Sequence, residues 1–349
     1  YQNGLIERPV AGTFEKIGAS VDDPAEGVEF FTELATQRSD FETHFGDAVA
    51  AAGFDFPELM KAALGNPKIK NFGMLSTEHG AIEDGRCFVP GMAPSDNLGY
   101  TVEILGPVVE PDAAGAPRLR RLGSYGETKN GHSVLLRLVF GNFSVLFGGD
   151  LNEPAEKFLI RHYSGLKRLP EAGTAAYRSM ISTVAARFRS DVMKSCHHGA
   201  ADVTDAFLEV VNPAAFVISS GDEEGHVHPR PDLLGRLGSF GRGGAPVILS
   251  TELQRSTREK EDAKVRQALE TDIDKLAIKP TPALLDKIKK KIAELARSNV
   301  EVYGAIYLKT DGERLMTAFK IETGSEIKKW FYYGYKLLPN GELVRMHRH

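Results

Sequence analysis

Three segments of this chain each end an apolar run on side chains that bind metals: Val145-Leu-Phe-Gly-Gly-Asp150, Asp191-Val-Met-Lys-Ser-Cys-His197-His198, and Val217-Ile-Ser-Ser-Gly-Asp222 followed by His226-Val-His228-Pro. Strands that stop at such residues would present carboxylate and imidazole at one edge of a sheet. Carboxylate plus neutral imidazole is ligand chemistry for Zn²⁺, Mn²⁺ or iron. More than half of the ten histidines lie between residues 132 and 228, and this clustering indicates a metal hydrolase rather than a generic soluble domain.

Around these segments the sequence alternates between strand and helix patterns. Gly141-Asn142 predicts a tight turn in a hairpin whose second strand leads to Asp150. Apolar runs predict strands at 101–107, 133–140, 143–147, 191–195, 215–219 and 246–250. Helical periodicity predicts helices at 154–163, 175–189, 203–211 and 232–240. This alternation predicts a layered α/β domain whose ligands lie on loops at one edge of the sheet.

The two ends of the chain differ from this central part. Before it, the pattern predicts a helix over 24–52 with an apolar face of Phe30, Phe31, Leu34 and Ala35, a second helix over 54–64, and loops over 80–100 and 112–130. After it, we expect charged helices at 257–273 and 282–298. Asp-Gly and Asn-Gly turns predict hairpins that pair 303–308 with 315–321 and 330–337 with 343–346. We therefore divide the chain into a hydrolase domain, 1–256, and a C-terminal extension of helices and hairpins, 257–349.

The bulk composition restricts the possible partners. The net charge is −4, so no global basic field attracts nucleic acid, and a nucleic-acid substrate would need a local basic patch. No apolar run approaches the roughly 18–20 residues of a membrane span. Cys87 and Cys196 lie far apart in sequence and form no disulfide framework, so a reducing cytoplasm is the simplest location.

The three segments resemble motifs of the metallo-β-lactamase superfamily, in the branch that contains the hydrolase domain of ComEC-type DNA-uptake proteins. The resemblance covers about residues 102–256, with a mild departure at Gly-Ala in the second motif. It implies an αββα sandwich and a centre of two divalent metal ions, zinc or manganese. The matching residues are Gly149-Asp150, His197-His198-Gly199-Ala200, Ser219-Ser-Gly-Asp222 and His226-Val-His228-Pro229.

The superfamily's central motif, His-x-His-x-Asp-His, is absent from this chain. A dinuclear centre needs about seven or eight ligands, and the residues present supply half of them. Two explanations stay open. The chain starts after the motif, so that the N-terminal part of the domain is missing, or the protein is a degenerate, non-catalytic member. A first residue other than methionine favours the former.

The resemblance assigns metal-binding roles. Asp150 would bridge two ions, although a carboxylate there could instead cap the following helix, as Asn152 could. His198 is the favoured ligand of its pair because Gly199 lets the backbone turn tightly, and His197 would support it or face substrate. Gly131-His132-Ser133 resembles the superfamily's Gly-His-Thr, so His132 is either a ligand or a polar residue that bonds the loop. We expect Cys196 to be a buried strand residue.

Other residues are candidates for substrate contact and proton transfer. We expect His228 to complete the metal site and act in catalysis with Asp150, and His226 to support it. Asp222 either orients a histidine or caps its loop. Asn130 stands where the related branch often has asparagine. The candidate phosphate-binding cations are Lys194, Arg230 and Arg255.

The implied reaction is metal-assisted hydrolysis by a hydroxide that forms at neutral pH. The resemblance favours a phosphodiesterase or nuclease, and the slight negative charge favours a single strand, a short oligonucleotide or a nucleotide over long duplex DNA. The alternatives are a hydrolase of a lactam or thioester and a non-catalytic scaffold. Under any of them the C-terminal extension could bind a protein partner.

Overall fold

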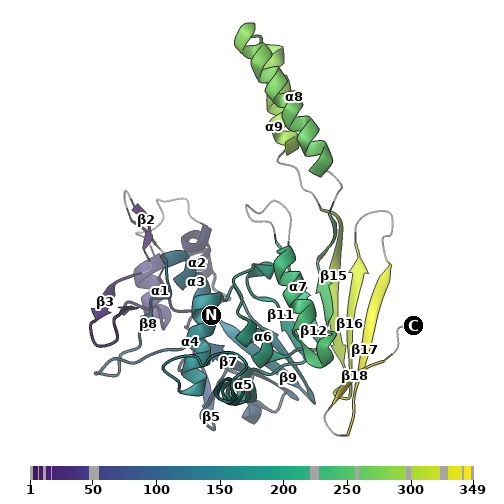
Figure 1. The fold of residues 1–349 in the computed structure, drawn as a ribbon. Coiled ribbons are helices and arrows are strands. Elements are labelled where there is room, and N and C mark those ends of the chain that lie inside the picture. The colour runs from purple at the N-terminus through teal and green to yellow at the C-terminus, as the bar shows by residue number, and fades with distance from the viewer. Residues whose placement is uncertain are drawn as a thin grey trace.

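The computed structural model describes residues 3–6, 8–10, 13–16, 18–46, 55–220, 228–255, 259–295, 300–322, 329–339 and 342–346. It is a mixed α/β structure with sheets of eight, five, three and two strands (Figure 1). The predicted α/β class is therefore confirmed. No described helix is both long enough and apolar enough to cross a membrane.

The eight-stranded sheet carries the segments that end on candidate ligands. Strands β10, β11, β12 and β13 run parallel to one another, and the strands from β9 to β5 are antiparallel to their neighbours. Its spatial order is β13 (Val247–Ser250), β12 (Ala215–Ile218), β11 (Val192–Lys194), β10 (Phe143–Phe147), β9 (Leu135–Phe140), β7 (Tyr100–Gly106), β6 (Arg86–Phe88) and β5 (Ala81–Glu83). Because the carboxyl ends of β10, β11 and β12 lie at one edge, the described parts of the three segments lie there.

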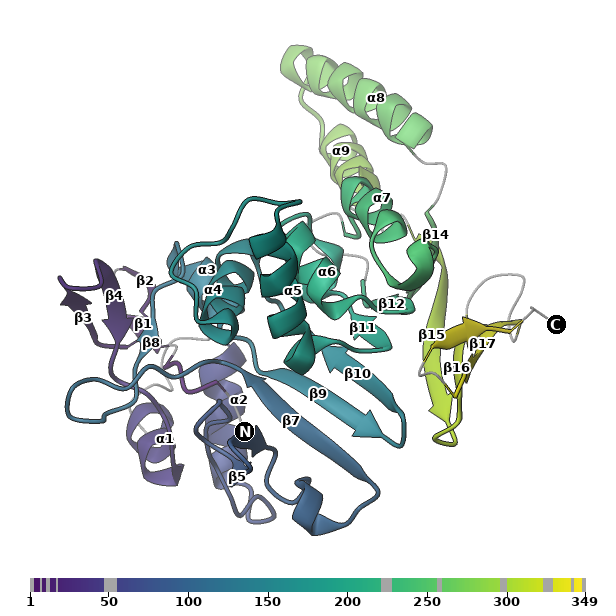
Figure 2. The same ribbon diagram turned by 60° about the horizontal axis from the view of Figure 1, so that its bottom comes forward.

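Four helices cover one face of this sheet, as Figure 2 shows. Their apolar residues form the main core with Leu135, Leu146 and Phe216 of the sheet. Three of the helices begin at side chains that accept a hydrogen bond from the first turn: Asn152, Thr174 and Thr204. The helices are α4 (Glu153–Ser164), α5 (Ala175–Phe188), α6 (Asp205–Val211) and α7 (Pro231–Ser239). Each strand and helix predicted between 133 and 250 is confirmed within a few residues.

A five-stranded antiparallel sheet covers part of the other face. Its order is β14 (Glu252–Arg255), β15 (Val300–Thr310), β16 (Arg314–Ile321), β17 (Trp330–Leu337) and β18 (Leu343–Arg345). A second core joins Phe143, Val192 and Val247 of the large sheet to Leu315 and Phe319 of the small one. Both predicted C-terminal hairpins are confirmed. The small sheet takes its first strand from before residue 257 and shares a core with residues 143–249, so its stability depends on both parts of the chain.

The N-terminal region corrects the prediction of one long helix. Residues 24–52 do not form one helix: β4 (Val28–Phe31) pairs with β3 (Ser20–Asp23) and β8 (Leu119–Arg120), and only α1 (Arg38–Phe45) is helical, while 47–52 lie outside the described residues. Phe30 and Phe31 are both buried because the strand is covered on both faces. The predicted helix at 54–64 is confirmed as α2 (Asp55–Gly65). The remaining pair of strands is β1 (Arg8–Val10) with β2 (Thr13–Lys16).

The two predicted loops also contain regular structure. Within 80–100, β5 and β6 form a hairpin whose turn residues, Asp84 and Gly85, both have positive φ, and residues Pro94–Asp96 form a short 3-10 helix. Within 112–130, β8 is followed by α3 (Tyr125–Gly131). Ser124 and Glu127 form a reciprocal capping box at the start of α3, a signal that the Ser-x-x-Glu spacing carried. Strong Gly and Asp turn signals obscured short elements in both regions.

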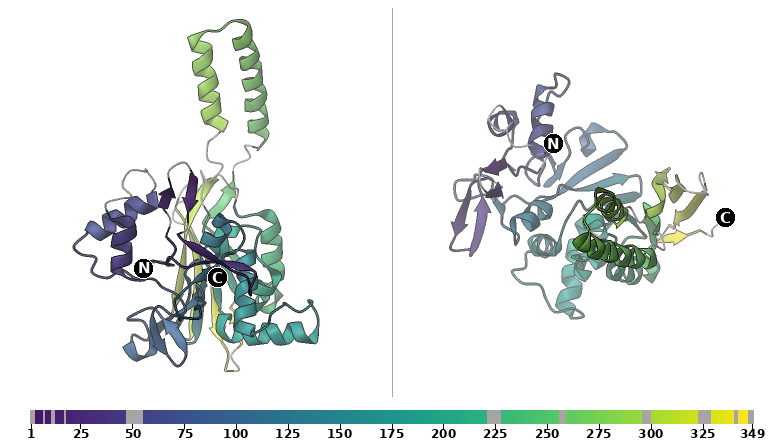
Figure 3. Two further views of the ribbon diagram at one scale, coloured as in Figure 1. Left: turned by 90° about the vertical axis from the view of Figure 1, so that its left-hand side faces the viewer. Right: turned by 90° about the horizontal axis from the view of Figure 1, so that it is seen from above.

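A helical hairpin projects from the body between β14 and β15 (Figure 3). It consists of α8 (Glu259–Ile278) and α9 (Pro282–Leu295), which confirms the two charged helices. Its described ion pairs hold the helices to each other, because Lys291 Nζ lies 2.6 Å from a carboxylate oxygen of Asp272 and Lys287 Nζ lies 3.1 Å from the same oxygen. The projection is therefore built as a unit apart from the sheets.

Removal of this hairpin should leave the body folded. Arg255 and Val300 are paired across β14 and β15, so an Asn-Gly turn in place of residues 256–299 matches a two-residue hairpin loop. A shorter connection also lowers the loop-closure entropy. We expect one cooperative thermal transition within about 3 °C of the intact chain, measured by differential scanning calorimetry. Loss of cooperative unfolding would contradict the separation.

Candidate functional site

Asp150 lies just beyond the carboxyl end of β10, on a turn that only glycine can make. Gly149 has φ +55°, and a Cβ atom there would lie 2.5 Å from Cβ of Ser133. The N–H of Asp150 donates to Ser133 Oγ at 2.9 Å, and Lys194 Nζ donates to the carbonyl of Gly149 at 3.1 Å. Asn152, not Asp150, caps α4 by accepting from the N–H of Ala155. The Asp150 carboxylate is thus left for the site, with 38% of its side chain exposed.

The paired histidines follow β11 in a strained conformation. His197 and His198 have φ values of 45° and 53°, in the left-handed region that non-glycine residues avoid. Each such residue costs on the order of 1–3 kcal/mol, and such strain concentrates at functional sites. The N–H of His197 donates to the carbonyl of Gly149 at 3.0 Å, which joins this turn to the Asp150 turn. The fold therefore holds both rings at the same edge as Asp150.

The geometry of His198 fits a metal ligand. Its Nδ1–H donates to the carbonyl of Ser219 at 2.8 Å, so the neutral ring has its lone pair on Nε2. Nε2 lies 3.4 Å from Oδ1 of Asp150, which is longer than a charge-assisted hydrogen bond of about 2.7–2.9 Å. Two ligand atoms each about 2.0–2.1 Å from one tetrahedral ion would lie about 3.3–3.4 Å apart. A histidine that binds a metal usually donates its other ring N–H to a carbonyl or carboxylate oxygen, as His198 does to Ser219.

His197 occupies the second half of the site. Its Nε2 lies 3.4 Å from Nδ2 of Asn130, and its ring centroid lies 5.8 Å from that of His228. Its Nδ1 lies 3.5 Å from Oδ1 of Asp202, and both of these atoms are buried and make no hydrogen bond within the described part of the chain. Buried polar atoms without partners are costly, so their presence side by side indicates that a proton or ligand joins this group.

A buried carboxyl lies close behind Asp202. Glu156 on α4 accepts hydrogen bonds at one oxygen from the N–H and the hydroxyl of Thr204, at 2.5 and 2.7 Å. Its other oxygen has no hydrogen-bond partner among the described residues. Burial, and then the Asp202 charge, raise the pKa of Glu156 to about 8, against hydrogen bonds from Thr204 that lower it. We did not predict Asp202 or Glu156: Asp202 follows the second motif by two residues, whereas nothing in the sequence near Glu156 signals a role.

The described side-chain hydrogen bond of His132 is made to the backbone of β8. Only 1% of the residue is exposed, and its Nε2–H donates to the carbonyl of Arg120 at 2.8 Å. Burial lowers the pKa of His132 to about 4, so the ring is neutral. We considered two roles for His132, a metal ligand and a polar residue that bonds the loop. Its hydrogen bond to Arg120 fits the second role.

The remaining candidates are placed as follows. Lys194 is tied to the backbone of Gly149, while Arg230 is half exposed beside Asp232, at 3.6 Å. Burial raises the pKa of the Cys196 thiol well above its ordinary value, and the residue is fully buried but lies in the short 3-10 helix Cys196–Gly199 and not in the predicted strand. Residues 221–227, with Asp222 and His226, and the side chain of Arg255 lie outside the described part.

The structure thus brings together Asn130, Asp150, His197, His198 and His228 at one sheet edge, with Asp202 behind them. Within the described residues, no group of three or more His, Cys, Asp or Glu side chains is close enough together to hold one metal ion. Among the described residues, Asp150 and His198 are therefore a pair of candidate ligands and not a complete set. Comparison with protein-family models gave no match for this chain, and comparison with curated proteins also gave none.

Proposed function

We propose that the chain is a metal-dependent hydrolase of phosphodiesters that resembles the metallo-β-lactamase superfamily and would use a dinuclear centre. The observation that carries the proposal is the Asp150–His198 pair. Its atoms face each other at 3.4 Å with the imidazole tautomer fixed by Ser219. The strained backbone of His197 and His198 supports it, because such strain is retained where geometry serves function.

Asp150 and His198 would hold a divalent ion, and His226 and His228 are candidates to complete the set from the third segment. An ion bound there would lower the pKa of a coordinated water to about 7 and polarise the scissile bond. The surrounding residues would orient the substrate and move protons. Asn130 offers an amide to a non-bridging oxygen, and His197 or His228 would donate a proton to the leaving oxygen. Asp202 would hold the ring of His197 through Nδ1, at its present 3.5 Å.

Metal binding and substrate choice test this proposal together. Purified chain would be titrated calorimetrically with Zn²⁺ and with Mn²⁺, beside His198→Ala and a Glu153→Gln control. Glu153 is an exposed carboxylate on the first turn of α4, paired with Lys157 on the same helix. We expect binding in the wild type and control, and at least tenfold weaker binding in His198→Ala.

Hydrolysis would then be measured with bis(4-nitrophenyl) phosphate, a chromogenic lactam and a thioester. Metal-dependent turnover of the phosphodiester supports the proposal. Faster turnover of the lactam or thioester would transfer the assignment to a carbonyl substrate. Absence of metal binding in the wild type would contradict the proposal for this chain.

A further inference from the structure

The outer face of the five-stranded sheet has a composition unlike the rest of the surface. The register places alternate residues of β15, β16, β17 and β18 on this face, opposite the residues of the shared core. We call this set the outer face. Its described members are Ala305, Tyr307, Lys309, Arg314, Met316, Ala318, Lys320, Trp330, Tyr332, Gly334, Lys336, Val344 and Met346.

Cations on the outer face have no acidic strand neighbours. Lys309, Arg314, Lys320 and Lys336 stand there, and none of its described members is Asp or Glu. Lys320 pairs with Glu322 beyond the end of β16, at 3.3 Å. Lys309 and Lys336 are exposed and form no ion pair within the described part of the chain. A protein of net charge −4 thus carries a local positive field on this face, which complements a polyanion.

Aromatic rings lie between these cations. Tyr307 and Tyr332 stand opposite Ala318 on either side, and Trp330 lies 5.1 Å from Tyr307 between ring centroids. Trp330 is 47% exposed and Tyr332 is 39% exposed. Trp330 and Tyr332 are two residues apart on β17 and therefore about 6.8 Å apart, so each of these two rings is accessible, while Tyr307 packs beside Trp330. Exposed rings alternating with lysine match the stacking platforms that bind unpaired bases.

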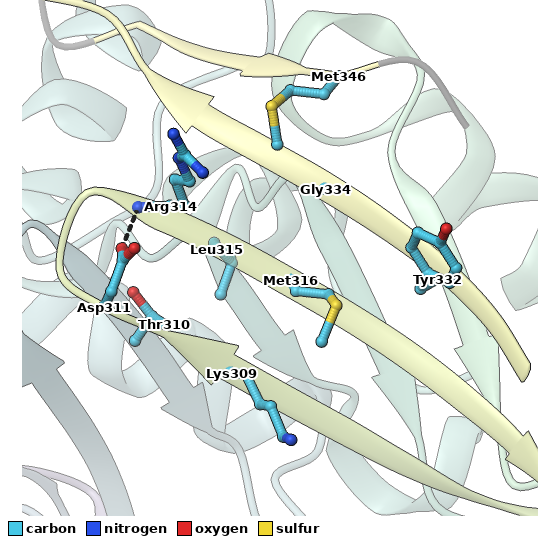
Figure 4. Close-up of a pocket in the computed structure, with 9 residues that line it drawn as sticks. All are labelled: Lys309, Thr310, Asp311, Arg314, Leu315, Met316, Tyr332, Gly334 and Met346. Atoms are coloured by element: carbon cyan, nitrogen blue, oxygen red, sulfur yellow. Dashed lines mark hydrogen bonds between the residues drawn. The ribbon is translucent and has the colours of Figure 1, made fainter. Parts of the chain in front are cut away.

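The outer face also contains a hollow of about 700 Å³ (Figure 4). Its floor is Gly334, which has no side chain, and Met316 and Met346 lie on either side. A Cβ atom on Gly334 would lie 2.8 Å from the terminal methyl of Met346, the flexible end of that side chain. Lys309 and Arg314 stand at its rim and Tyr332 at one end, and Asp311, which accepts a hydrogen bond from the N–H of Arg314, also lines it. Such a recess has room for a planar base, and the cations at its rim would face the phosphate attached to that nucleotide.

We propose that the outer face binds single-stranded nucleic acid, with bases stacked on Tyr307, Trp330 and Tyr332 and phosphates neutralised by Lys309, Arg314 and Lys336. A duplex hides its bases from such rings, and a neutral polysaccharide offers nothing to the cations. This binding surface goes beyond the hydrolase proposal, because it needs neither metal nor the Asp150 edge.

One end of the outer face lies toward the sheet edge that carries Asp150. Its hollow lies beside Gly312, whose carbonyl accepts from the N–H of Asn142, at the far end of the β9–β10 hairpin. At the other end, Gly304 donates to the carbonyl of Thr251, and the hydroxyl of Thr251 accepts from the N–H of Ser220. Ser220 follows Ser219, the partner of His198. A nucleic-acid single strand that runs from the hollow past Trp330 would therefore lead toward the candidate site, a consequence that rests on the proposed function.

Fluorescence anisotropy with a labelled 12-nucleotide single strand tests the proposal. The full chain is used at about 50 mM salt with EDTA present, so that binding is separated from hydrolysis. We expect W330A/Y332A to weaken binding at least tenfold, and W330F/Y332F to bind within about threefold of wild type because phenylalanine keeps the stacking surface. K309Q/K336Q should weaken binding and reduce the salt dependence by one to two ions, roughly one per lost phosphate contact.

The matched control is K289Q/K290Q, which removes the same charge from exposed positions on α9 and should bind like wild type. Circular dichroism of each variant establishes that it is folded. Wild-type binding by W330A/Y332A, equal weakening by the α9 control, or binding of anionic phosphatidylserine vesicles without binding of the oligonucleotide would overturn the proposal. An Asp150→Ala variant should bind the oligonucleotide as the wild type does. Failure of the hydrolase proposal can therefore be distinguished from failure of this binding proposal.

Discussion

Replacement of Asp150 by alanine should lower the rate of phosphodiester hydrolysis at least 100-fold. The carboxylate is one of the two described groups that would hold the proposed ion, and loss of a ligand removes both affinity and charge stabilisation. The fold should persist, because 38% of the side chain is exposed and Asn152 caps α4. We expect the melting temperature to change by no more than about 2 °C.

Steady-state rates and metal content per chain measure this effect. Glu153→Gln is the control, because it removes one exposed negative charge three residues away without touching the site. An Asp150→Ala protein that retains both its full metal content and its activity would exclude the proposed role. A variant that unfolds would show that the carboxylate serves the fold instead.

Glu156→Gln should raise stability near pH 8 and remove part of its pH dependence. The folded-state pKa of Glu156 is about 8, against an ordinary value of 4.5. The stability that this raised pKa contributes is fully present below pH 4.5, and is lost as the pH rises toward about 8, because the unfolded chain releases the proton first. Glutamine keeps an oxygen for the two Thr204 donors but has no proton to lose.

Thermal denaturation of both proteins from pH 5 to pH 9 tests the sign. The difference in melting temperature, variant minus wild type, should grow with pH up to about 8 and then level off. The difference isolates Glu156, since His132 and other groups titrate in both proteins. A constant difference would mean that Glu156 ionises equally in the folded and unfolded states. Glu156→Ala should destabilise at every pH, because the Thr204 donors at the start of α6 would lose their acceptor.

The central part of the fold was predictable because its signals are local. The β9–β10 hairpin follows from Gly141-Asn142 between two apolar strands, and β11, β12 and β13 follow from short apolar runs between helices. Residues 28–31 were not predictable in this way. Their apolar spacing fits a helix, and pairing with the distant strand β8 makes them a strand. Partners far away in sequence override local propensity wherever a segment can gain a sheet neighbour.

The candidate site divides along the same line. The amino-acid sequence by itself determined which residue types stand at the ends of β10 and β11, because each strand end and its ligand are neighbours in the chain. Only the tertiary structure decided which of them meet. It placed His198 against Asp150 and Ser219, directed His132 to Arg120, and brought Asp202 and Glu156 behind His197. It also decided that lysines and aromatic rings from three strands share one outer face. The physical reason is that side-chain type and strand alternation are local properties, whereas distance, burial and the pKa values that burial sets arise only when separate segments pack together.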